Sequence, residues 1–162
     1  MNAAAPFLPR SDSKIVLALV LGAYSIVLDR LLFLIVLVFR TVRQPPTMLS
    51  HYGRWAEALD SVVLFPIVAG TVLVATIELL RLLRLPRVLQ IVLAAAASCA
   101  VNGRSSWPMG IILAPLFLLS GYAYLLWRPH SWSVALAYTI LIMVVSGLPA
   151  GISVFEHATR SA

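Results

Sequence analysis

The sequence predicts an all-α protein, a multi-span transmembrane helical bundle with about five spans. Hydrophobic residues make up 61% of its 162 residues and charged residues only 11%, whereas soluble domains are closer to half apolar and one quarter charged. The mean hydropathy is +0.97. Several apolar runs approach or exceed the roughly 20 residues that a helix needs to cross a bilayer. Lipid is therefore the expected solvent for most of the chain.

The first two spans are separated by a polar connector. Residues 15–39 form an apolar run long enough to cross with some tilt. No small-residue cleavage site closes a short apolar core there, so we expect this span to be retained and not removed as a signal peptide. In the connector, residues 48–59 are expected to form a short amphipathic helix at the membrane interface. The second span covers residues 61–83, and Pro86 ends it.

The third and fourth spans differ in character. Residues 87–101 are few and rich in alanine, so we expect them to pack inside the bundle, where small residues let helices approach closely. The fourth span begins at Trp107 and ends at Trp127, as in an aromatic belt at the two membrane surfaces. Pro108 fits a helix start, and Pro115 predicts a kink.

A fifth span is expected over residues 132–155, after the turn Arg-Pro-His-Ser. The chain then divides into two parts. Residues 1–60 hold the first transmembrane helix and the interfacial connector. Residues 61–162 hold a four-span core.

The net charge of +6 is explained by basic residues at the ends of the apolar runs. Lipid headgroups attract Lys and Arg at such positions, so membrane lipids are expected partners and nucleic acid is not. These flanking residues are Arg10, Lys14, Arg40, Arg43, Arg81, Arg84, Arg87, Arg128 and Arg160. When Arg54 and Arg104 are counted as well, the basic residues divide six against five between the two sides, with a slight preference for an N-terminus inside.

Asp29, Arg30 and Glu78 are taken as intramembrane charged residues, and ionisable groups at membrane depth are costly and therefore candidates for function. Asp29 and Arg30 point about 100° apart on a helix, so we expect each to meet partners on other helices. They are interpreted as structural charges, with the lining of a polar path as the alternative. Glu78 precedes Arg81 by one turn, which predicts an i,i+3 contact at the membrane interface.

The sequence predicts no metal site and no cofactor. The histidines, His51, His130 and His157, are far apart and lie outside the spans, and no two of them share a helix face as zinc ligands do. Cys99 is interpreted as a small buried hydrophobic residue. The alternative is a nucleophile activated by Arg104, which requires a positive neighbour to lower the pKa of the thiol.

From Ser61 onward the chain resembles the CPBP family of membrane-embedded CAAX-processing and bacteriocin-immunity proteases. Residues 62–103 show the family's order of proline, span, basic break and small-residue span. Residues 117–141 are similar to its small-residue helix, arginine-containing turn and final span. The resemblance implies a helical protease bundle within the membrane.

The family's catalytic motifs are absent from the matching positions of this chain. The family's paired glutamates match Ala69 and Gly70, and its arginine matches Val74. Its Phe-x-x-x-His pair matches Ser98 and Asn102, and its final histidine matches either Tyr138 or Thr139. Peptide hydrolysis needs a carboxylate to activate water and polar groups to stabilise the oxyanion. Alanine, glycine and valine provide neither. The resemblance therefore implies a pseudo-protease in which these seven residues line a vestigial pocket.

We expect a non-catalytic integral membrane protein of the bacterial inner membrane. It would act as a binding, assembly or accessory subunit for another membrane protein or a lipidic ligand. One alternative is an active CAAX-type endopeptidase that uses displaced residues, with Glu78 as the base and Asn102 or a histidine assisting. Another is a small carrier that uses Asp29 and Arg30. If the resemblance is accidental, Ala69 and Gly70 form a small-residue patch for helix contact.

Overall fold

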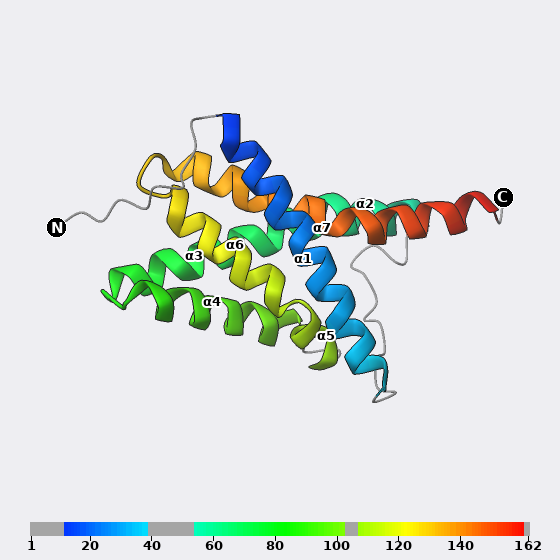
Figure 1. The fold of residues 1–162 in the computed structure, drawn as a ribbon, viewed down its shortest axis with the longest axis horizontal. Helices are drawn as coiled ribbons and strands as arrows, with labels where there is room; N and C mark the ends of the chain where they lie inside the picture. Colours follow the sequence, from blue (N-terminus) through cyan, green and yellow to red (C-terminus); the bar gives the residue numbers. More distant parts are fainter. Residues whose placement is uncertain (1–11, 39–53, 103–106, 161–162) are drawn as a thin grey trace.

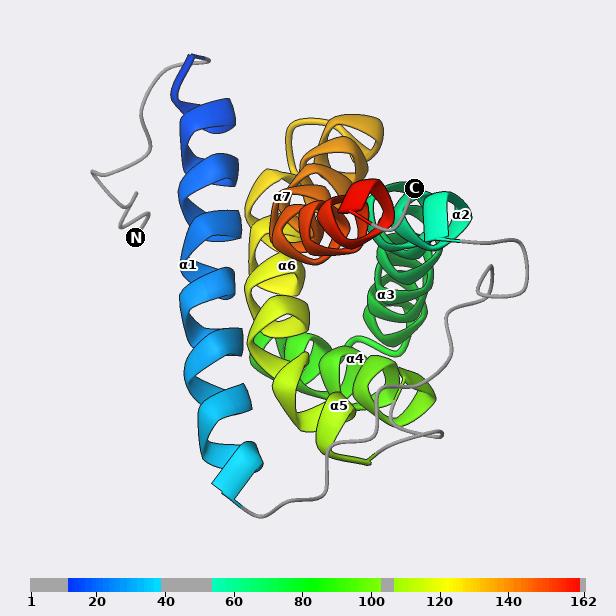
Figure 2. The same cartoon turned by 90° about the vertical axis from the view of Figure 1, so that its right-hand side faces the viewer.

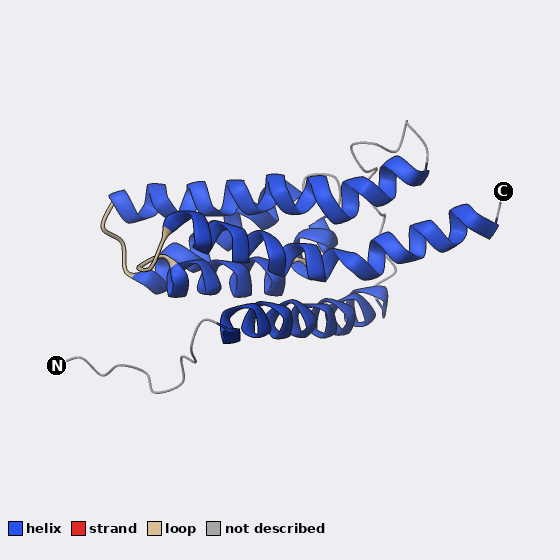
Figure 3. Cartoon of the chain, turned by 90° about the horizontal axis from the view of Figure 1, so that it is seen from above, coloured by secondary structure: helices blue, strands red, loops and turns tan. Residues whose placement is uncertain are grey.

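The described part of the protein is a bundle of α-helices joined by short turns (Figures 1 and 3). The computed structural model describes residues 12–38, 54–102 and 107–160. No β-strand occurs in these ranges, so the predicted all-α, multi-span bundle is confirmed. Four helical stretches in them are long and apolar enough to cross a membrane: Lys14–Ile35, Asp60–Leu82, Trp107–Trp127 and Trp132–Ser153.

Helix α1 (Asp12–Val38) lies along one side of the bundle and packs against α6 and α7 (Figure 2). Its buried face is narrow and includes Ala18 and Ser25. Its outer face exposes large apolar side chains such as Val20 and Leu34. Such an apolar face is suited to contact with lipid. The predicted first span is therefore confirmed as a long apolar helix at this position.

Helices α2 (Arg54–Leu59) and α3 (Phe65–Leu82) are continuous through a π-helical turn, η2 (Asp60–Leu64). In this turn the Phe65 N–H donates to the Asp60 carbonyl, five residues back. Pro66 follows directly, and its ring and missing N–H disturb the turn before it. The wide turn accommodates that disturbance. Helix α2 confirms a helix over the C-terminal half of residues 48–59, and its place at the membrane interface stays a prediction. Residues 48–53 lie outside the described residues.

The turn after α3 ends the helix as predicted and reverses the chain. Arg84 takes a left-handed conformation with φ 56°. Its N–H donates to the Arg81 carbonyl at 2.9 Å, and the Leu85 N–H donates to the Leu80 carbonyl at 3.4 Å. These two bonds form a Schellman motif, a common helix ending in which the left-handed position is usually glycine.

Helix α4 (Arg87–Asn102) runs back along α3 and also packs against α6. Ala94, Ala95 and Ser98 are buried, whereas Leu93 and Val101 on its other face are exposed. The expectation that this helix packs inside the bundle is therefore wrong, because one whole face of it is exposed. The face that contacts its neighbours does consist mainly of small residues. It is apolar but shorter than the four long stretches.

The fourth span is broken where a kink was predicted. Helix α5 (Trp107–Ile112) and helix α6 (Ala114–Trp127) meet at Leu113, two residues before Pro115. Trp107 is exposed, and its place in an aromatic belt stays a prediction. The aromatic-belt prediction is wrong for Trp127, which is 1% exposed and packs on Tyr138 with ring centroids 4.8 Å apart. The ring is buried because α7 folds back over the end of α6.

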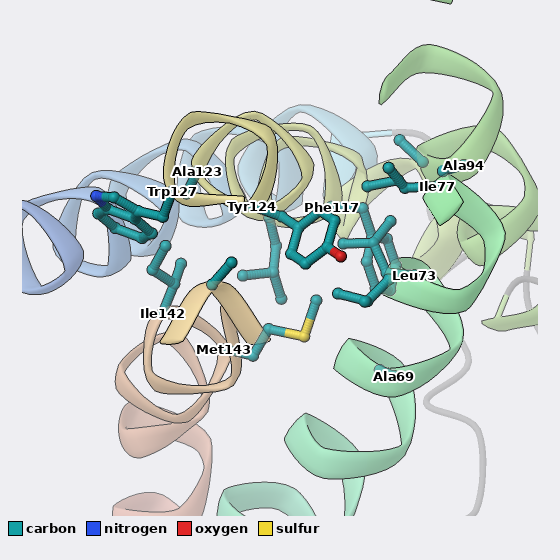
Figure 4. Packing of buried hydrophobic residues seen from close by; sticks show 14 of the residues in the cluster. Ala69, Leu73, Ile77, Ala94, Phe117, Ala123, Tyr124, Trp127, Ile142 and Met143 are labelled. Atoms are coloured by element: carbon teal, nitrogen blue, oxygen red, sulfur yellow. The ribbon is translucent and has the colours of Figure 1, made fainter. Parts of the chain in front are cut away.

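Helix α7 (Trp132–Arg160) is central to the bundle, since it contacts α1, α2, η2, α3 and α6. Figure 2 shows it nearly end-on among these helices. The core lies where α3, α6 and α7 meet, and its side chains include Leu73, Phe117, Tyr124, Ile142 and Met143 (Figure 4).

Helix α7 approaches η2 closely because residue 147 has no side chain. A Cβ at Gly147 would lie 2.6 Å from the Ser61 carbonyl oxygen. That oxygen belongs to the backbone, so it cannot turn aside as a flexible side chain does. Glycine at this position therefore sets the distance between the last span and the start of the second.

Gly147→Ala is expected to lower the free energy of unfolding by about 1–3 kcal/mol, because the added methyl group forces two backbones apart. Helix propensity alone predicts the opposite sign. The measurement is thermal unfolding of the purified protein in mild detergent, followed by circular dichroism.

The matched control is Gly121→Ala on α6. A Cβ there would meet Ile91 Cγ2 at 3.4 Å, which is ordinary van der Waals contact. This variant should therefore be as stable as the wild type or more stable by up to about 1 kcal/mol, the gain in helix propensity. Equal stability of the two variants would contradict the close contact at Gly147.

Candidate functional site

The most connected polar group in the described bundle is the carboxylate of Glu78, near the end of α3. Its Oε1 accepts a hydrogen bond from the Tyr124 hydroxyl at 2.5 Å and another from Arg128 Nε at 2.6 Å. Arg81 Nη1 lies 3.3 Å from Oε2. These four residues, Glu78, Arg81, Tyr124 and Arg128, are called the Glu78 cluster below.

Helix geometry brings the Glu78 cluster together. Tyr124 and Arg128 are four residues apart at the end of α6, so both face the same neighbour, α3. Arg81 lies one turn after Glu78, and the predicted i,i+3 contact between them is confirmed. The two partners on α6 were not predicted. The i,i+4 spacing of Tyr124 and Arg128 is the signal that could have indicated them.

The two ion pairs of Glu78 differ in strength. The pair with Arg128 is short and partly shielded, with side chains 30% and 28% exposed, whereas Arg81 is 49% exposed and farther away. A short charge-assisted hydrogen bond is stronger than a loose surface pair. The hydrogen bond to Glu78 also raises the pKa of Arg128 above its ordinary value. The Glu78 cluster therefore links α3 to α6 through a hydrogen-bonded ion pair.

The α3 residues at the matched catalytic positions are packed. Ala69, Gly70 and Val74 are buried. A Cβ at Gly70 would lie 3.1 Å from Ile140 Cγ1 and 3.4 Å from Met143 Sδ. Helix α7 thus fills the space in front of Gly70.

The other matched positions satisfy their polar groups within their own helices or not at all. Asn102 Nδ2 donates to the Ser98 carbonyl at 2.7 Å, and Thr139 Oγ1 donates to the Ala135 carbonyl at 2.8 Å. The Ser98 hydroxyl is buried without a partner among the described residues. Tyr138 packs on Trp127. Within this set, no described hydrogen bond joins residues of different helices.

Asp29 meets a partner on another helix, as expected. The Ser146 hydroxyl of α7 donates to Asp29 Oδ2 at 3.3 Å, and Asp29 Oδ1 is buried with no partner among the described residues. Arg30 is exposed, and no ion pair within 4.0 Å joins it to Asp29. The two residues therefore do not act as one charge pair.

In the described ranges, no three His, Cys, Asp or Glu side chains could hold a metal ion. His51 lies outside these ranges, and His130 is exposed. Cys99 lines a shallow apolar hollow of about 350 Å³ with Trp107, Gly110 and Ile111, among others. None of the vestigial-pocket residues lines this hollow. Asp60, which was not predicted as a candidate, is buried in η2.

Comparisons of the chain with protein-family models, with curated proteins and with solved structures found no match. The resemblance to the CPBP family therefore stays a prediction from the residues quoted above.

Arg128→Gln is expected to lower the free energy of unfolding by about 1–2 kcal/mol, because it removes the short charged hydrogen bond to Glu78. Arg81→Gln, the matched control, should cost less than about 1 kcal/mol, since it removes only a loose and exposed ion pair. Thermal unfolding in detergent compares the two. A larger loss for Arg81→Gln would contradict the assignment of Arg128 as the principal partner.

Asp29→Asn is expected to leave stability unchanged or slightly higher. The asparagine still accepts the Ser146 hydrogen bond, and the cost of burying a carboxylate disappears. The same unfolding assay measures it, with Ser146→Ala as the control for the hydrogen bond. A loss of several kcal/mol in Asp29→Asn would show that the bundle needs the negative charge.

Proposed function

We propose that this chain is a non-catalytic integral membrane protein, a pseudo-protease that resembles the CPBP family. In this proposal it acts as a binding, assembly or accessory subunit for another membrane protein or a lipidic ligand. The single observation that carries the proposal is the packing of α7 against Gly70. It occupies the space that a catalytic carboxylate and its water would need.

Hydrolysis within a membrane requires an acid held beside a water molecule in an otherwise dry site. At Gly70 even a single added carbon would meet Ile140 at 3.1 Å. Ala69 and Val74 are likewise buried in the apolar core. This region is therefore built for helix contact, and no cavity for a peptide bond is present at these positions.

The remaining acid of the core supports the same conclusion. Glu78 is the only Asp or Glu between Asp60 and Glu156, and its carboxylate already accepts from Tyr124 and Arg128. Taking a proton from water would require Glu78 to give up these bonds. A peptidase that uses Glu78 as a displaced base is thus disfavoured by the contacts of that residue.

The exposed surface supports a partner within the membrane. Most described helices expose large apolar side chains, including Tyr24, Leu31, Val72 and Tyr122, and such surfaces are covered by lipid or by other membrane helices. As its location we propose the bacterial inner membrane. The helical spans support this, because proteins of the bacterial outer membrane cross it as β-barrels.

The test is a peptide cleavage assay with the purified chain in lipid nanodiscs, using prenylated and membrane-anchored peptides as substrates. We expect no cleavage above that of the heat-denatured protein. In cells that depend on the gene, Glu78→Gln and Asn102→Ala should retain the biological activity once expression is matched.

Arg128→Gln is the control for stability, because it disrupts the same link between α3 and α6 and leaves the carboxylate in place. If Glu78→Gln abolishes activity and Arg128→Gln does not, the carboxylate itself is required. That result, or cleavage that is lost in Glu78→Gln, would refute the proposal and favour the endopeptidase.

A further inference from the structure

The turn between α3 and α4, residues 81–87, concentrates positive charge at one end of the bundle. It is called the basic turn below. Arg81, Arg84 and Arg87 are all exposed. The nearest acid in the sequence is Glu78, and its shortest ion pair is with Arg128. Arg84 and Arg87 have no carboxylate within 4.0 Å among the described residues, so their charge is available to an anion.

Exposed apolar side chains surround these arginines. Leu82 is 80% exposed, Leu83 65% and Val88 70%. A site for a small soluble phosphate does not need such neighbours. A phospholipid does, because its charged headgroup and its acyl chains meet at the membrane surface. The combination of guanidinium groups and exposed leucines therefore fits a lipid.

The backbone of the turn adds two observations. The first-turn N–H groups of α4 begin at Arg87, and a helix N-terminus favours a nearby anion. Arg84 occupies the left-handed position with φ 56°, where a residue with a Cβ costs about 1–2 kcal/mol relative to glycine. Arginine at this position therefore makes the turn less stable than glycine would, and this cost points to a use for the arginine charge.

We propose that the basic turn binds the phosphate headgroup of an anionic phospholipid. Arg84 and Arg87 contact the phosphate, and Arg81 provides further charge. Leu82, Leu83 and Val88 contact the upper acyl chains. This inference goes beyond the proposed function, because it holds whether or not the bundle is catalytic and whether or not a protein partner exists.

The experiment measures lipid binding to the purified full chain in detergent by native mass spectrometry, with phosphatidylglycerol and phosphatidylcholine offered in equal amounts. The wild type is expected to prefer phosphatidylglycerol, and added salt should weaken the preference. Arg84→Gly should reduce affinity for phosphatidylglycerol about fivefold, and Arg84→Gly combined with Arg87→Gln about thirtyfold. Binding of phosphatidylcholine should not change.

Arg84→Gly separates lipid binding from stability. Without added lipid its melting temperature should equal or exceed that of the wild type, because glycine adopts φ 56° without strain. Arg30→Gln is the control for charge, since it removes an exposed arginine from another part of the surface. It should leave affinity for phosphatidylglycerol unchanged.

Three results would overturn the inference. In the first, the wild type shows no preference for phosphatidylglycerol. In the second, the double variant binds phosphatidylglycerol as tightly as the wild type does. In the third, glycerol phosphate alone raises the melting temperature as much as phosphatidylglycerol does, which would make the basic turn a site for free anions.

Discussion

The close approach of α7 to its neighbours is the constraint on which the rest of this structure depends. Helices in lipid gain little from hiding apolar surface, so their association relies on packing and on the few polar contacts available. Here the backbone of α7 comes near η2 because Gly147 has no side chain, and it comes near α3 because Gly70 has none. Of the other described helices, α1, α2, α3 and α6 touch α7, whereas α4 does not. The same closeness places Ile140 and Met143 of α7 directly against Gly70. The packing that holds α7 to α3 is therefore also the observation on which the proposed loss of catalysis rests.

The Glu78 cluster has a different task from the glycine contacts. Packing sets how near two helices come but leaves them able to slide, whereas a short hydrogen bond between charged groups fixes their register. Glu78 sits near the end of α3, where Arg128 reaches it from the end of α6 and Tyr124 from one turn earlier. A carboxylate is costly at membrane depth unless it is paired. Its position near a helix end, together with three donors, explains how a charged side chain can be retained at this point of the bundle.

Much of the fold could be predicted from the sequence, because apolar run length and proline position act locally. The spans, the ending of α3 at Pro86 and the kink before Pro115 all follow from such signals.

Contacts between helices could not be predicted in the same way. The partners of Glu78 on α6 lie some 46 and 50 residues away, and only their i,i+4 spacing hinted at a shared face. Trp127 shows the same limit, because the sequence places it at a span end and the fold of α7 buries it. The π-helical turn also has no clear sequence signal apart from Pro66. The positions matched to the CPBP family lie on α3, α4 and α7, but no sequence pattern indicated that side chains of α7 would pack against Gly70.

The π-helical turn has a consequence for how the second span is oriented. A turn of this kind holds one residue more than an α-helical turn, and one residue corresponds to a rotation of about 100° around the helix axis. The side of α3 that meets α7 is therefore out of phase with the side of α2 that does so, although the two helices form one unbroken rod. A helical wheel drawn over residues 54–82 as a single α-helix would therefore misplace the residues before η2 by about 100° relative to those after it. The two segments need separate wheels, offset at η2.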